Sequence, residues 1–495
     1  MIRYFFSYVF IYVLWLLRKL VSRDGRTYLL LFIPQIQPIL TWISRVRLYA
    51  VFYRAKQKCP AYKSFLASED YDEGGKWAIE KVPVMTKENY VKKYSIQERC
   101  YGGKIPFPGT VIDESSGSSG IPNNWVRDKS ERNDVRRILQ LNYEIIYNNS
   151  ECILLNCFAL GPWATGMNVS MSLVDVGILK SIGPDAAKLE NTLTLFGPGY
   201  RYLVFGYPPF LKLWLDNTEL DLSRYQMDAV VGGEGMSEGL RSFLLRSFKS
   251  VVSSYGASDL EINIAVETEL TIELRRRCFA DRELSMEIFG RESPPMIFQY
   301  NAADYLIEQL PGGELIYSIL RLEGAAPKIR YNLGDLGGTI QHRDLRTILG
   351  KRNLEIAGLA ARQSSFPILY VHGRGNLSVP FYGCKVFPSN IEEIINSHPR
   401  LVDRFNSFQI KNIEDEDLKR RLVVYLEKTA SGENEQIPGS DELHEIMFSE
   451  LCRVNQDFRE VTKIFDRSCV IVEVQDFEKG VFAGRDIRIK NKYID

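Results

Sequence analysis

Two short stretches of this sequence combine hydroxyl, glycine and carboxylate residues in a way that suits phosphate chemistry. The first is residues 114–122, with the sequence ESSGSSGIP, and the second is residues 254–259, with the sequence SYGASD. Glycine permits positive φ, so consecutive backbone N–H groups can converge on an anion, and serine hydroxyls add further donors. In the second stretch an aromatic ring, a hydroxyl and a carboxylate are spaced to contact a base, a phosphate and Mg²⁺. Taken alone, the first stretch is more often only a loop, and the alternative for the second is a simple turn with a surface acid.

Three further segments carry candidate binding groups. Residues 230–234 (VVGGE) form an apolar strand that ends in two glycines, where a flat ring can approach the backbone. Residues 329–337 (IRYNLGDLG) contain Asp335, whose two carboxylate oxygens match the two adjacent donors of a ribose diol. Residues 373–376 (GRGN) form a turn with one fixed cation, Arg374. The alternative for Asp335 is an ordinary β-turn aspartate.

The composition sets limits on these interpretations. The chain has 495 residues, of which 45% are hydrophobic, and its 62 basic residues balance its 62 acidic residues. A zero formal charge disfavours binding along a nucleic-acid backbone, so any nucleotide site is local. Eight cysteines without a CxxC pair, and four histidines without ligand spacing, argue against zinc. We expect the cysteines to be core residues of a protein in a reducing compartment.

Alternating strand and helix patterns predict a layered α/β fold. We expect strands near Val111, at 124–127, within 152–160 and at 420–427, and helices at 43–66 (ending at the Cys59–Pro60 step) and 131–148. In the segment 388–395, Ser389 and Glu392 have the spacing of a capping box at the start of an amphipathic helix. The change of pattern after residue 371 predicts a domain boundary near residue 376.

The N-terminal 44 residues are the most hydrophobic part of the chain. Residues 4–17 carry no charge and are followed by Arg18 and Lys19, but fourteen residues rise only about 21 Å as a helix, less than the membrane core. A second uncharged run, 27–44, contains Pro34 and Pro38, which interrupt a spanning helix. The segment therefore either lies in a membrane interface or packs on the main body, and basic residues behind it keep the rest cytoplasmic.

Taken in this order and spacing, the five segments resemble the phenylacetate–CoA ligase-like branch of the adenylate-forming superfamily, from about Leu48 to the C-terminus. The family's SSGTTGKP phosphate loop is similar to SSGSSGIP here, its YGxSE to YGASD, and its IRYRTGD to IRYNLGD. Its short Gly-Glu segment corresponds to Gly233-Glu234, and its hinge and FPxxIE motifs to GRGN and FPSNIEE. The resemblance implies a large multi-sheet adenylate-forming domain and a smaller, mobile α+β C-terminal domain. We place these at 45–375 and 376–495, after the hydrophobic segment 1–44.

The resemblance also implies a reaction in which a carboxylate attacks the α-phosphate of ATP and a thiol then displaces AMP. Its implied residue roles are as follows: Ser115, Ser116, Gly117, Ser118, Ser119 and Gly120 hold the β- and γ-phosphates, Gly233 and Glu234 border the adenine, Tyr255 and Gly256 stack against it, Ser258 touches the α-phosphate, Asp259 binds Mg²⁺, and Asp335 and Arg374 hold the ribose. Asn376 would be the hinge. The acyl pocket would draw on residues 158–163 and the segment before Tyr255.

This chain departs from the family pattern at four positions. Ile121 replaces the phosphate-loop lysine, Asp259 replaces a glutamate, and Asn376 replaces the hinge acid. At the place of the family's C-terminal catalytic lysine stands Arg485, which is cationic but not equivalent to lysine. Lys490 is the main rival for that role, and Lys479 and Lys492 lie nearby.

Two classes of function follow from these residues. The first is an ATP- and Mg²⁺-dependent acid–thiol ligase, with coenzyme A as the expected acceptor and an aromatic or fatty acid as the substrate. In a variant of it, the acyl group passes to a carrier protein or an amine. The second class is a degenerate, membrane-associated nucleotide-binding scaffold, which Ile121 favours and the intact YGASD and IRYNLGD motifs disfavour.

Overall fold

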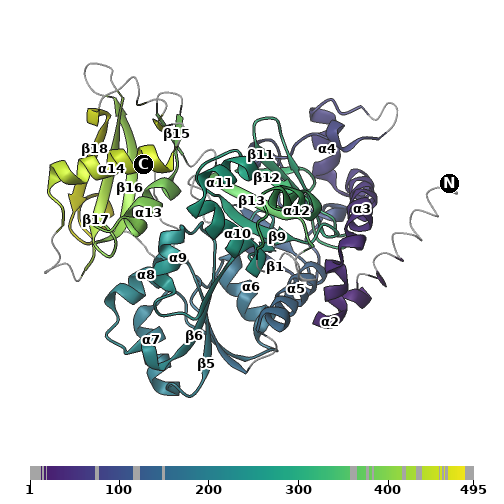
Figure 1. The fold of residues 1–495 in the computed structure, drawn as a ribbon. Coiled ribbons are helices and arrows are strands. Elements are labelled where there is room, and N and C mark those ends of the chain that lie inside the picture. The colour runs from purple at the N-terminus through teal and green to yellow at the C-terminus, as the bar shows by residue number, and fades with distance from the viewer. Residues whose placement is uncertain are drawn as a thin grey trace.

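A computed structural model describes residues 13–484, apart from 14–15, 18, 73–76, 115–122, 148–150, 357–364, 375–377, 382–383, 415–419, 431–436, 456–457, 460–461 and 463–466. The described chain forms a large lobe up to residue 374 and a small lobe from residue 378 onward (Figure 1). The small lobe lies on the opposite side of the molecule from the first helices (Figure 1).

The large lobe is built on one mixed sheet of 11 strands in the order β10-β11-β12-β13-β9-β8-β7-β6-β5-β3-β4. These strands are β3 (Cys152–Asn156), β4 (Ile178–Ser181), β5 (Arg201–Gly206), β6 (Gln226–Gly232), β7 (Ser250–Ala257), β8 (Glu261–Val266), β9 (Met296–Tyr300), β10 (Tyr305–Gln309), β11 (Glu314–Ile319), β12 (Tyr331–Ile340) and β13 (Ile368–Arg374). Strands β4, β3, β5, β6 and β7 run parallel, and from β7 to β10 the pairs are antiparallel. A separate hairpin pairs β1 (Val111–Glu114) with β2 (Asn124–Arg127).

Helices cover this sheet, as the alternating sequence pattern predicts. They are α2 (Gly25–Tyr28), α3 (Gln37–Lys58), α4 (Pro60–Ser68), α5 (Lys129–Tyr147), α6 (Ala164–Leu173), α7 (Ala186–Phe196), α8 (Pro208–Asn217), α9 (Glu238–Leu244), α10 (Glu269–Ala280), α11 (Arg282–Phe289) and α12 (His342–Lys351). Short helical turns lie at Leu29–Phe32, Pro34–Ile36, Ile79–Lys81, Lys87–Val91, Tyr101–Gly103 and Leu222–Arg224. All five residues of β3 are buried, as expected for a strand covered on both faces.

The small lobe has its own sheets and its own core. Strands β16 (Phe405–Glu414), β17 (Arg420–Lys428) and β18 (Val470–Gln475) form a three-stranded sheet, and β14 (Val379–Phe381) pairs with β15 (Cys384–Val386). Helices α13 (Pro388–Ser397) and α14 (Ser440–Val454) pack on these strands, and turns lie at Arg467–Cys469 and Gly480–Phe482. A hydrophobic cluster running from Val379 to Val470 is separate from the clusters of the large lobe. The domain limit at residue 376 stays a prediction, because 375–377 lie outside the described residues.

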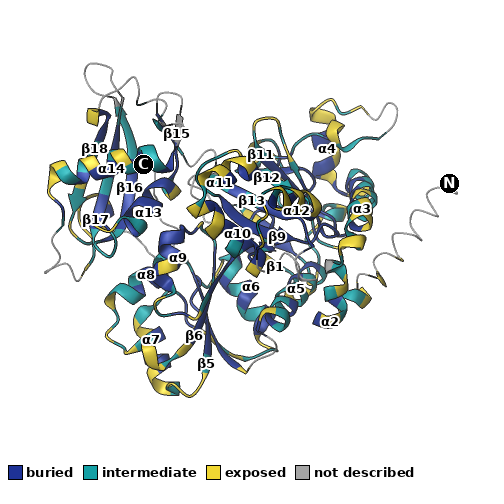
Figure 2. Cartoon of the chain, viewed as in Figure 1, coloured by how far each residue is buried: buried dark blue, intermediate teal, exposed yellow. Residues whose placement is uncertain are grey.

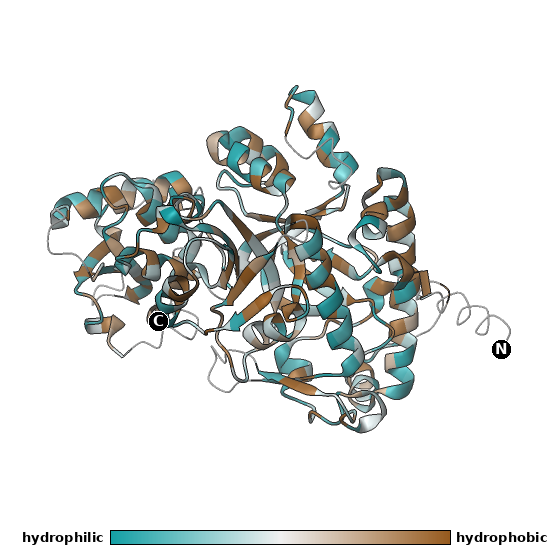
Figure 3. Ribbon diagram, turned by 90° about the horizontal axis from the view of Figure 1, so that it is seen from below, coloured by the Kyte–Doolittle hydropathy of each residue, from teal (hydrophilic) through white to brown (hydrophobic). Residues whose placement is uncertain are grey.

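Burial follows the same organisation. The strands of the main sheet are largely buried, whereas the outer turns of the helices are exposed (Figure 2). Most helices carry hydrophobic and hydrophilic residues on different sides (Figure 3), which is typical of helices that pack one face on a sheet. Of the seven cysteines whose side chains are described, all are free and six are buried.

Two local predictions were wrong. The predicted capping box of Ser389 and Glu392 does not form, because Pro388 occupies the first turn and Asn390 Oδ1 accepts from the Phe387 N–H at 2.9 Å instead. The helix predicted within 43–66 ends at the Cys59–Pro60 step as expected, but its predicted start is wrong. Helix α3 begins earlier, at Gln37, since Pro38 is tolerated in a first turn, and Pro60 starts α4.

The N-terminal prediction is covered only in part, because most of residues 4–17 lie outside the described chain. Helix α3 packs on the large lobe through one buried face that includes Leu40, Leu48 and Val51. Among the described residues no single helix has the length and hydrophobicity to cross a membrane. The segments Gly25–Leu31 and Pro34–Lys58, bent by 59° where they meet, satisfy these two criteria only as a pair.

Candidate active site

Two of the predicted segments meet at the carboxyl ends of neighbouring parallel strands. Gly232, the last residue of β6, pairs with Ser254 of β7, so the Gly-Glu segment lies beside the Tyr-Gly segment. Gly233 has φ +83°, and a Cβ at this position would lie 2.5 Å from a ring carbon of Tyr207. Only glycine fits there. In sheets with parallel strands, ligands bind at this edge.

A third segment joins them through the hydroxyl of Tyr255. This hydroxyl donates a short hydrogen bond to Asp335 Oδ2 on β12 and lies 2.6 Å from the hydroxyl of Tyr317. The Tyr255 ring stacks near Tyr317 at a centroid distance of 6.1 Å and also contacts Phe298 at 5.6 Å. Burial, followed by the adjacent Asp335 charge, raises the pKa of Tyr255 well above its ordinary value, so the tyrosine stays a donor. Asp335 in turn pairs with Arg374 in the β12–β13 register.

Asp259 lies in the turn between β7 and β8, inside the protein. Its Oδ1 accepts from the indole N–H of Trp125 at 2.9 Å, and its Oδ2 accepts from the Tyr331 hydroxyl at 3.5 Å. The ammonium of Lys87 lies 3.6 Å from Oδ2. The carboxylate is therefore held in place by one strand of the β1–β2 hairpin, by β12 and by the turn after Met85. Met85 itself forms a bridge to Tyr331.

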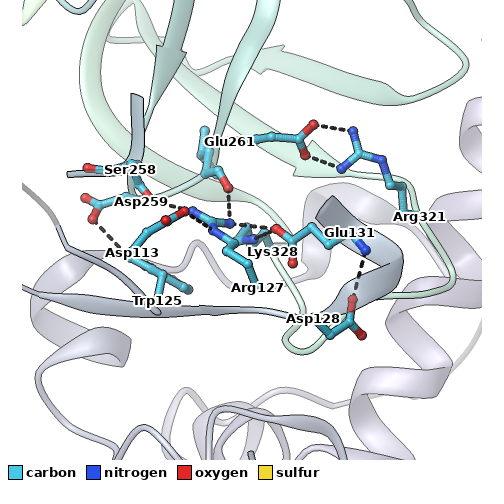
Figure 4. A network of polar contacts seen from close by, with 12 residues as sticks. Asp113, Trp125, Arg127, Asp128, Glu131, Ser258, Asp259, Glu261, Arg321 and Lys328 are labelled. Atoms are coloured by element: carbon cyan, nitrogen blue, oxygen red, sulfur yellow. Dashed lines mark hydrogen bonds and ion pairs between the residues drawn. The ribbon is translucent and has the colours of Figure 1, made fainter. Parts of the chain in front are cut away.

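A buried cluster of charges fixes the turn that carries Asp259 (Figure 4). Arg127, on β2, donates to the carbonyl oxygens of Ser258 at 2.5 Å and Leu260 at 2.6 Å, on either side of Asp259. The same guanidinium contacts Asp113 at 3.0 Å and Glu131 at 2.7 Å. Residues 115–122, the predicted phosphate loop, connect the two strands of this hairpin. The arginine therefore ties both ends of that loop to the Ser258–Asp259 turn.

The cluster is electrostatically balanced despite its burial. Burial alone would raise the pKa of Glu131, but the adjacent Lys328 and Arg127 charges hold this pKa at about 2. Lys328 Nζ lies 2.8 Å from the Glu131 carboxylate. Farther along, Glu261 forms a short ion pair with Arg321, whose guanidinium also donates to the Tyr305 hydroxyl at 2.9 Å. Paired and hydrogen-bonded in this way, the charges hold their geometry inside a low-dielectric interior.

An apolar cavity opens next to these groups. Its mouth is lined by Glu114, Gly232, Gly233, Gly256 and Ser258. Its interior runs between the sheet and helices α5 and α6, and most of the side chains that line it are apolar. Trp163, which forms a bridge to Glu114, also lines it, together with Phe158.

The small lobe reaches this edge through helix α13. Glu392 accepts from the backbone N–H of Ser237 at 3.0 Å, and α13 packs on α9. A Cβ on Gly239 of α9 would lie 2.7 Å from the backbone carbon of Asn396, so the helices are in close contact. Burial, followed by the nearby Glu234 charge, raises the pKa of Glu392 to about 8. The Gly-Glu segment of the large lobe therefore faces a carboxyl group of the small lobe.

Comparison with solved structures identifies the architecture. The chain superposes on 2-hydroxyisobutyryl-CoA ligase in its postadenylation state, bound to R3-HIB-AMP, with a TM-score of 0.61 over 91% of this chain and 89% of that one, at 13% identity. The same ligase with 2-HIB-AMP and CoA in the thioesterification state gives 0.52 over 94% and 91%, also at 13% identity. The chain has the adenylate-forming fold. No protein-family model matches the sequence, and neither does any curated protein.

Within the adenylate-forming fold, the described site residues occupy one region. Gly233, Glu234, Tyr255, Gly256, Ser258, Asp259 and Asp335 lie at or beside the β6–β7 edge. The backbone of Arg374 pairs with Asp335, but its side chain is not described. Ser115, Ser116, Gly117, Ser118, Ser119, Gly120, Ile121, Asn376, Arg485, Lys490 and Lys492 lie outside the described residues. Lys479 is exposed in the small lobe, 3.7 Å from Asp476.

Sequence reasoning missed two groups of the site. Lys87 lies in a stretch that reads only as polar and turn-rich, although the Thr86–Asn89 cap beside it is a local signal for a fixed turn. The sequence predicts Arg127 only as the last residue of a strand, because its carbonyl partners lie more than 130 positions away. No pattern in a single sequence pairs residues over that separation.

Among the described residues no group of three or more His, Cys, Asp or Glu side chains is arranged around a metal position. Asp259 fits a different mode of binding, in which Mg²⁺ is held by one or two carboxylates, water and substrate phosphates. Both oxygens of Asp259 already accept hydrogen bonds, and Lys87 lies 3.6 Å from Oδ2, so a Mg²⁺ ion would compete with this ammonium for the carboxylate.

Proposed function

We propose that this chain activates a carboxylic acid with ATP, forming an acyl-adenylate and pyrophosphate, and then transfers the acyl group to a thiol. The observation that carries the proposal is that Gly233 and Ser258 line one apolar cavity, while Tyr255, on the same strand end, is hydrogen-bonded to Asp335. The cavity has room for an acid, and Tyr255 and Asp335 beside it are suited to binding a nucleotide. The adenylate-forming fold supports the same reaction.

The residues divide the work of the first step. Residues 115–120 follow β1 and are assigned to the ATP phosphates, and Ser258, whose carbonyl accepts from Arg127 of β2, is assigned to the α-phosphate. Asp335 and Arg374 hold the ribose, while Tyr255 and Gly233 border the base. Positioning the carboxylate in line with the α-phosphate and neutralising the leaving pyrophosphate are the main requirements of such a displacement. Asp259 would hold Mg²⁺ with the phosphates, and bound Mg²⁺ would supply part of that neutralising charge.

Lys87 supplies a cation that residue 121 does not. The family's phosphate-loop lysine is Ile121 here. Lys87 Nζ lies 3.6 Å from Asp259, and its side chain is 27% exposed, so it reaches the same turn from a different element. We assign it to the triphosphate of ATP. We assign the C-terminal cation, Arg485 or Lys490, to contacts with the α-phosphate and the reacting carboxylate.

The acceptor that we propose is coenzyme A, as in the phenylacetate–CoA ligase-like branch that the motifs resemble. The alternatives are a carrier-protein thiol and an amine, which use the same adenylate. Because all three acceptors act after pyrophosphate has left, the first step is tested without deciding among them. A chain that binds ATP and releases no pyrophosphate with any acid would be a scaffold instead.

The test combines two measurements on the full chain. Thermal melting with ATP and Mg²⁺ reports nucleotide binding, and pyrophosphate release with a panel of carboxylic acids reports activation. We expect ATP to raise Tm and at least one acid to support release, and Asp335→Ala to abolish both effects. Asp344→Ala, at an exposed position of α12, is the matched control and leaves both unchanged. If the wild type shows no Tm shift with ATP and releases no pyrophosphate with any acid, the proposal is rejected.

A further inference from the structure

The cavity at the active site is long and follows the strands of the sheet. Its floor contains Leu203 of β5, Val230 of β6 and Val252 of β7 at the inner end, and Gly232 and Gly256 at the mouth. Residues two apart on a strand lie on the same face, so Val252, Ser254 and Gly256 form one continuous row along β7. Helices α5 and α6 form the roof, with Tyr143 and Leu173 among the lining residues.

The separation of the two ends sets the size of the ligand. The six residues of β7 from Val252 to Ala257 extend about 17 Å at the rise of a β-strand. The nine residues of α5 from Leu139 to Tyr147 extend about 12 Å. A small acid fills only the mouth of such a cavity and leaves the inner apolar lining without a partner.

The chemistry of the lining selects the tail of the acid. Among the described residues that line the cavity, Glu114 at the mouth is the only one with a charged side chain. A second charge at the far end of the substrate would therefore be buried without a counter-ion, which is strongly unfavourable. Leucine, valine and tyrosine side chains at the inner end instead favour hydrocarbon.

We infer that the acid activated by this chain has a single carboxylate and an extended, uncharged hydrocarbon tail, rather than a compact or a dicarboxylic structure. The inference rests on the proposed function, because the cavity is read as the acyl site of the adenylation reaction. The carboxylate lies at the Gly232–Gly256 mouth and the tail runs toward Val252.

The test is kcat/KM for pyrophosphate release with straight-chain acids of increasing length. We expect about a fourfold rise per added methylene, which corresponds to about 0.8 kcal/mol of buried CH₂, until the cavity is filled. Val252→Phe and Leu139→Phe shorten the cavity and shift the optimum to shorter acids, whereas Ile178→Phe, at an exposed position, leaves it unchanged. Release that is highest with short or dicarboxylic acids would overturn the inference but keep the proposed function; release with none would reject the proposed function itself.

A second, independent observation concerns the N-terminal surface. Large hydrophobic side chains are concentrated there. Seven of the seventeen that are exposed among the described residues are Val13, Leu16, Leu17, Leu20, Leu30, Ile39 and Trp42. Val13, Leu16, Leu17 and Leu20 have the spacing of one helix face, and their exposed fractions lie between 40% and 59%. Such a stripe on the outside of a folded chain marks a contact with another apolar phase.

The charge of the same region identifies that phase. Of residues 1–58, ten are Lys or Arg and only Asp24 is acidic, although the whole chain has a formal charge of zero. Among the exposed residues of this segment are Lys19, Arg23, Arg26 and Arg45, next to the exposed hydrophobic side chains. An apolar stripe flanked by basic residues fits the interface of an anionic lipid bilayer.

We propose that the exposed N-terminal stripe, Val13, Leu16 and Leu20 with Lys19, Arg23 and Arg26, docks the full chain on an anionic membrane surface. The docked segment is joined to the acyl site through α5. Arg137 of α5 donates to the backbone carbonyls of Ser22 and Arg23, and Glu144 accepts from the Gly25 N–H at 2.9 Å. The opposite side of α5 lines the cavity with Leu139, Tyr143 and Ile146.

Flotation of the full chain with vesicles tests this docking. We expect binding to vesicles that contain phosphatidylserine, at least fivefold weaker binding to phosphatidylcholine vesicles, and at least fivefold weaker binding after Leu16→Glu with Leu20→Glu. Leu195→Glu, which replaces a leucine that is 73% exposed on α7, is the matched control and keeps wild-type binding. Unchanged Tm shows that the variants fold. Equal flotation of the wild type and the double variant would overturn the proposal. It would also be overturned if the wild type binds no lipid but forms an oligomer that the double substitution disrupts.

Discussion

The hydroxyl of Tyr255 donates a hydrogen bond to the carboxylate of Asp335, 80 residues farther along the chain. The contact joins the YGASD motif to the IRYNLGD motif, which sit on β7 and β12 with three strands between them in the sheet. Two motifs that the sequence suggests for one nucleotide therefore lie within a hydrogen bond of each other. This placement is the basis of the proposed function.

Lys87 gives the first prediction. If its ammonium contacts the triphosphate, Lys87→Ala removes a charge-assisted interaction worth about 1.5–3 kcal/mol, which lowers kcat/KM for ATP about ten- to a hundredfold. Lys87→Arg keeps the charge and retains part of the activity. Steady-state kinetics with varied ATP measure the effect. Lys92→Ala, which breaks an exposed pair with Glu88 four residues earlier, is the control, and an equal loss in both alanine variants would contradict the assignment.

Arg127 gives a prediction on stability. Arg127→Met leaves Asp113 and Glu131 without a shared counter-ion in a buried site, which we expect to lower the free energy of unfolding by about 3–5 kcal/mol. Urea denaturation measures the change. Arg136→Met removes only an exposed pair with Asp175 and should change stability by less than about 0.5 kcal/mol. Similar urea midpoints for the two variants would show that the buried cluster contributes little.

Gly233 tests the packing of the strand end. Gly233→Ala places a Cβ 2.5 Å from Tyr207 at a positive φ, so we expect a cost of about 1–2 kcal/mol for the backbone and a further cost of about 1–3 kcal/mol for the overlap. Gly290→Ala has the same sign of φ and no neighbouring atom within 4 Å, so only the first cost applies. The two melting curves, together with the ATP-induced Tm shift, separate strain from lost binding. If Gly233→Ala has the same Tm as Gly290→Ala and still binds ATP, the close approach of residue 233 to Tyr207 is refuted.

Glu392 predicts a pH dependence. Its pKa rises from an ordinary 4.5 to about 8, because the carboxyl is buried and faces Glu234. Below pH 4.5 the Glu392 carboxyl holds its proton in both the folded and the unfolded chain, and the folded chain loses no stability through this group. Between about 4.5 and 8 only the folded chain holds it, so stability falls as the pH rises, by at most about 1.4 kcal/mol per pH unit.

The variant Glu392→Gln cannot ionise and should lose this part of the pH dependence. The measurement is Tm against pH from 5 to 9 for both proteins, where we expect the wild type to fall relative to the variant and the difference to level off above pH 8. Parallel curves over the whole range would contradict the raised pKa of Glu392.

The parts of the fold that the sequence predicts well are those with local signals. Strands β1, β2, β3 and β17 and helix α5 lie where apolar periodicity and flanking turns place them. The positions of the glycine motifs at strand ends follow from the same signals, since glycine after an apolar run marks the end of a strand. Helix boundaries at prolines were less accurate, because Pro38 and Pro60 start helices and do not only end them.

The site was predictable where its residues are contiguous and not where it depends on distant partners. Tyr255, Ser258 and Asp259 belong to one short segment, so their proximity is fixed by the chain itself. The pairing of Arg127 with Glu131 is local, but its contacts with the 258–260 turn and the link from Glu131 to Lys328 depend on how the whole lobe packs. Buried charges that stabilise one another across the sheet leave no periodic pattern.

The exchange of labelled pyrophosphate into ATP, measured with an acid and without any acceptor, tests adenylate formation most directly. It requires the acid, ATP and the residues around Tyr255 and Asp335, and it does not depend on whether coenzyme A, a carrier or an amine follows. We predict acid-dependent exchange by the wild type that falls at least a hundredfold in Asp335→Ala and is unchanged in Asp344→Ala. Exchange at the wild-type rate in Asp335→Ala, or none with any acid in a wild type that binds ATP, would contradict the account.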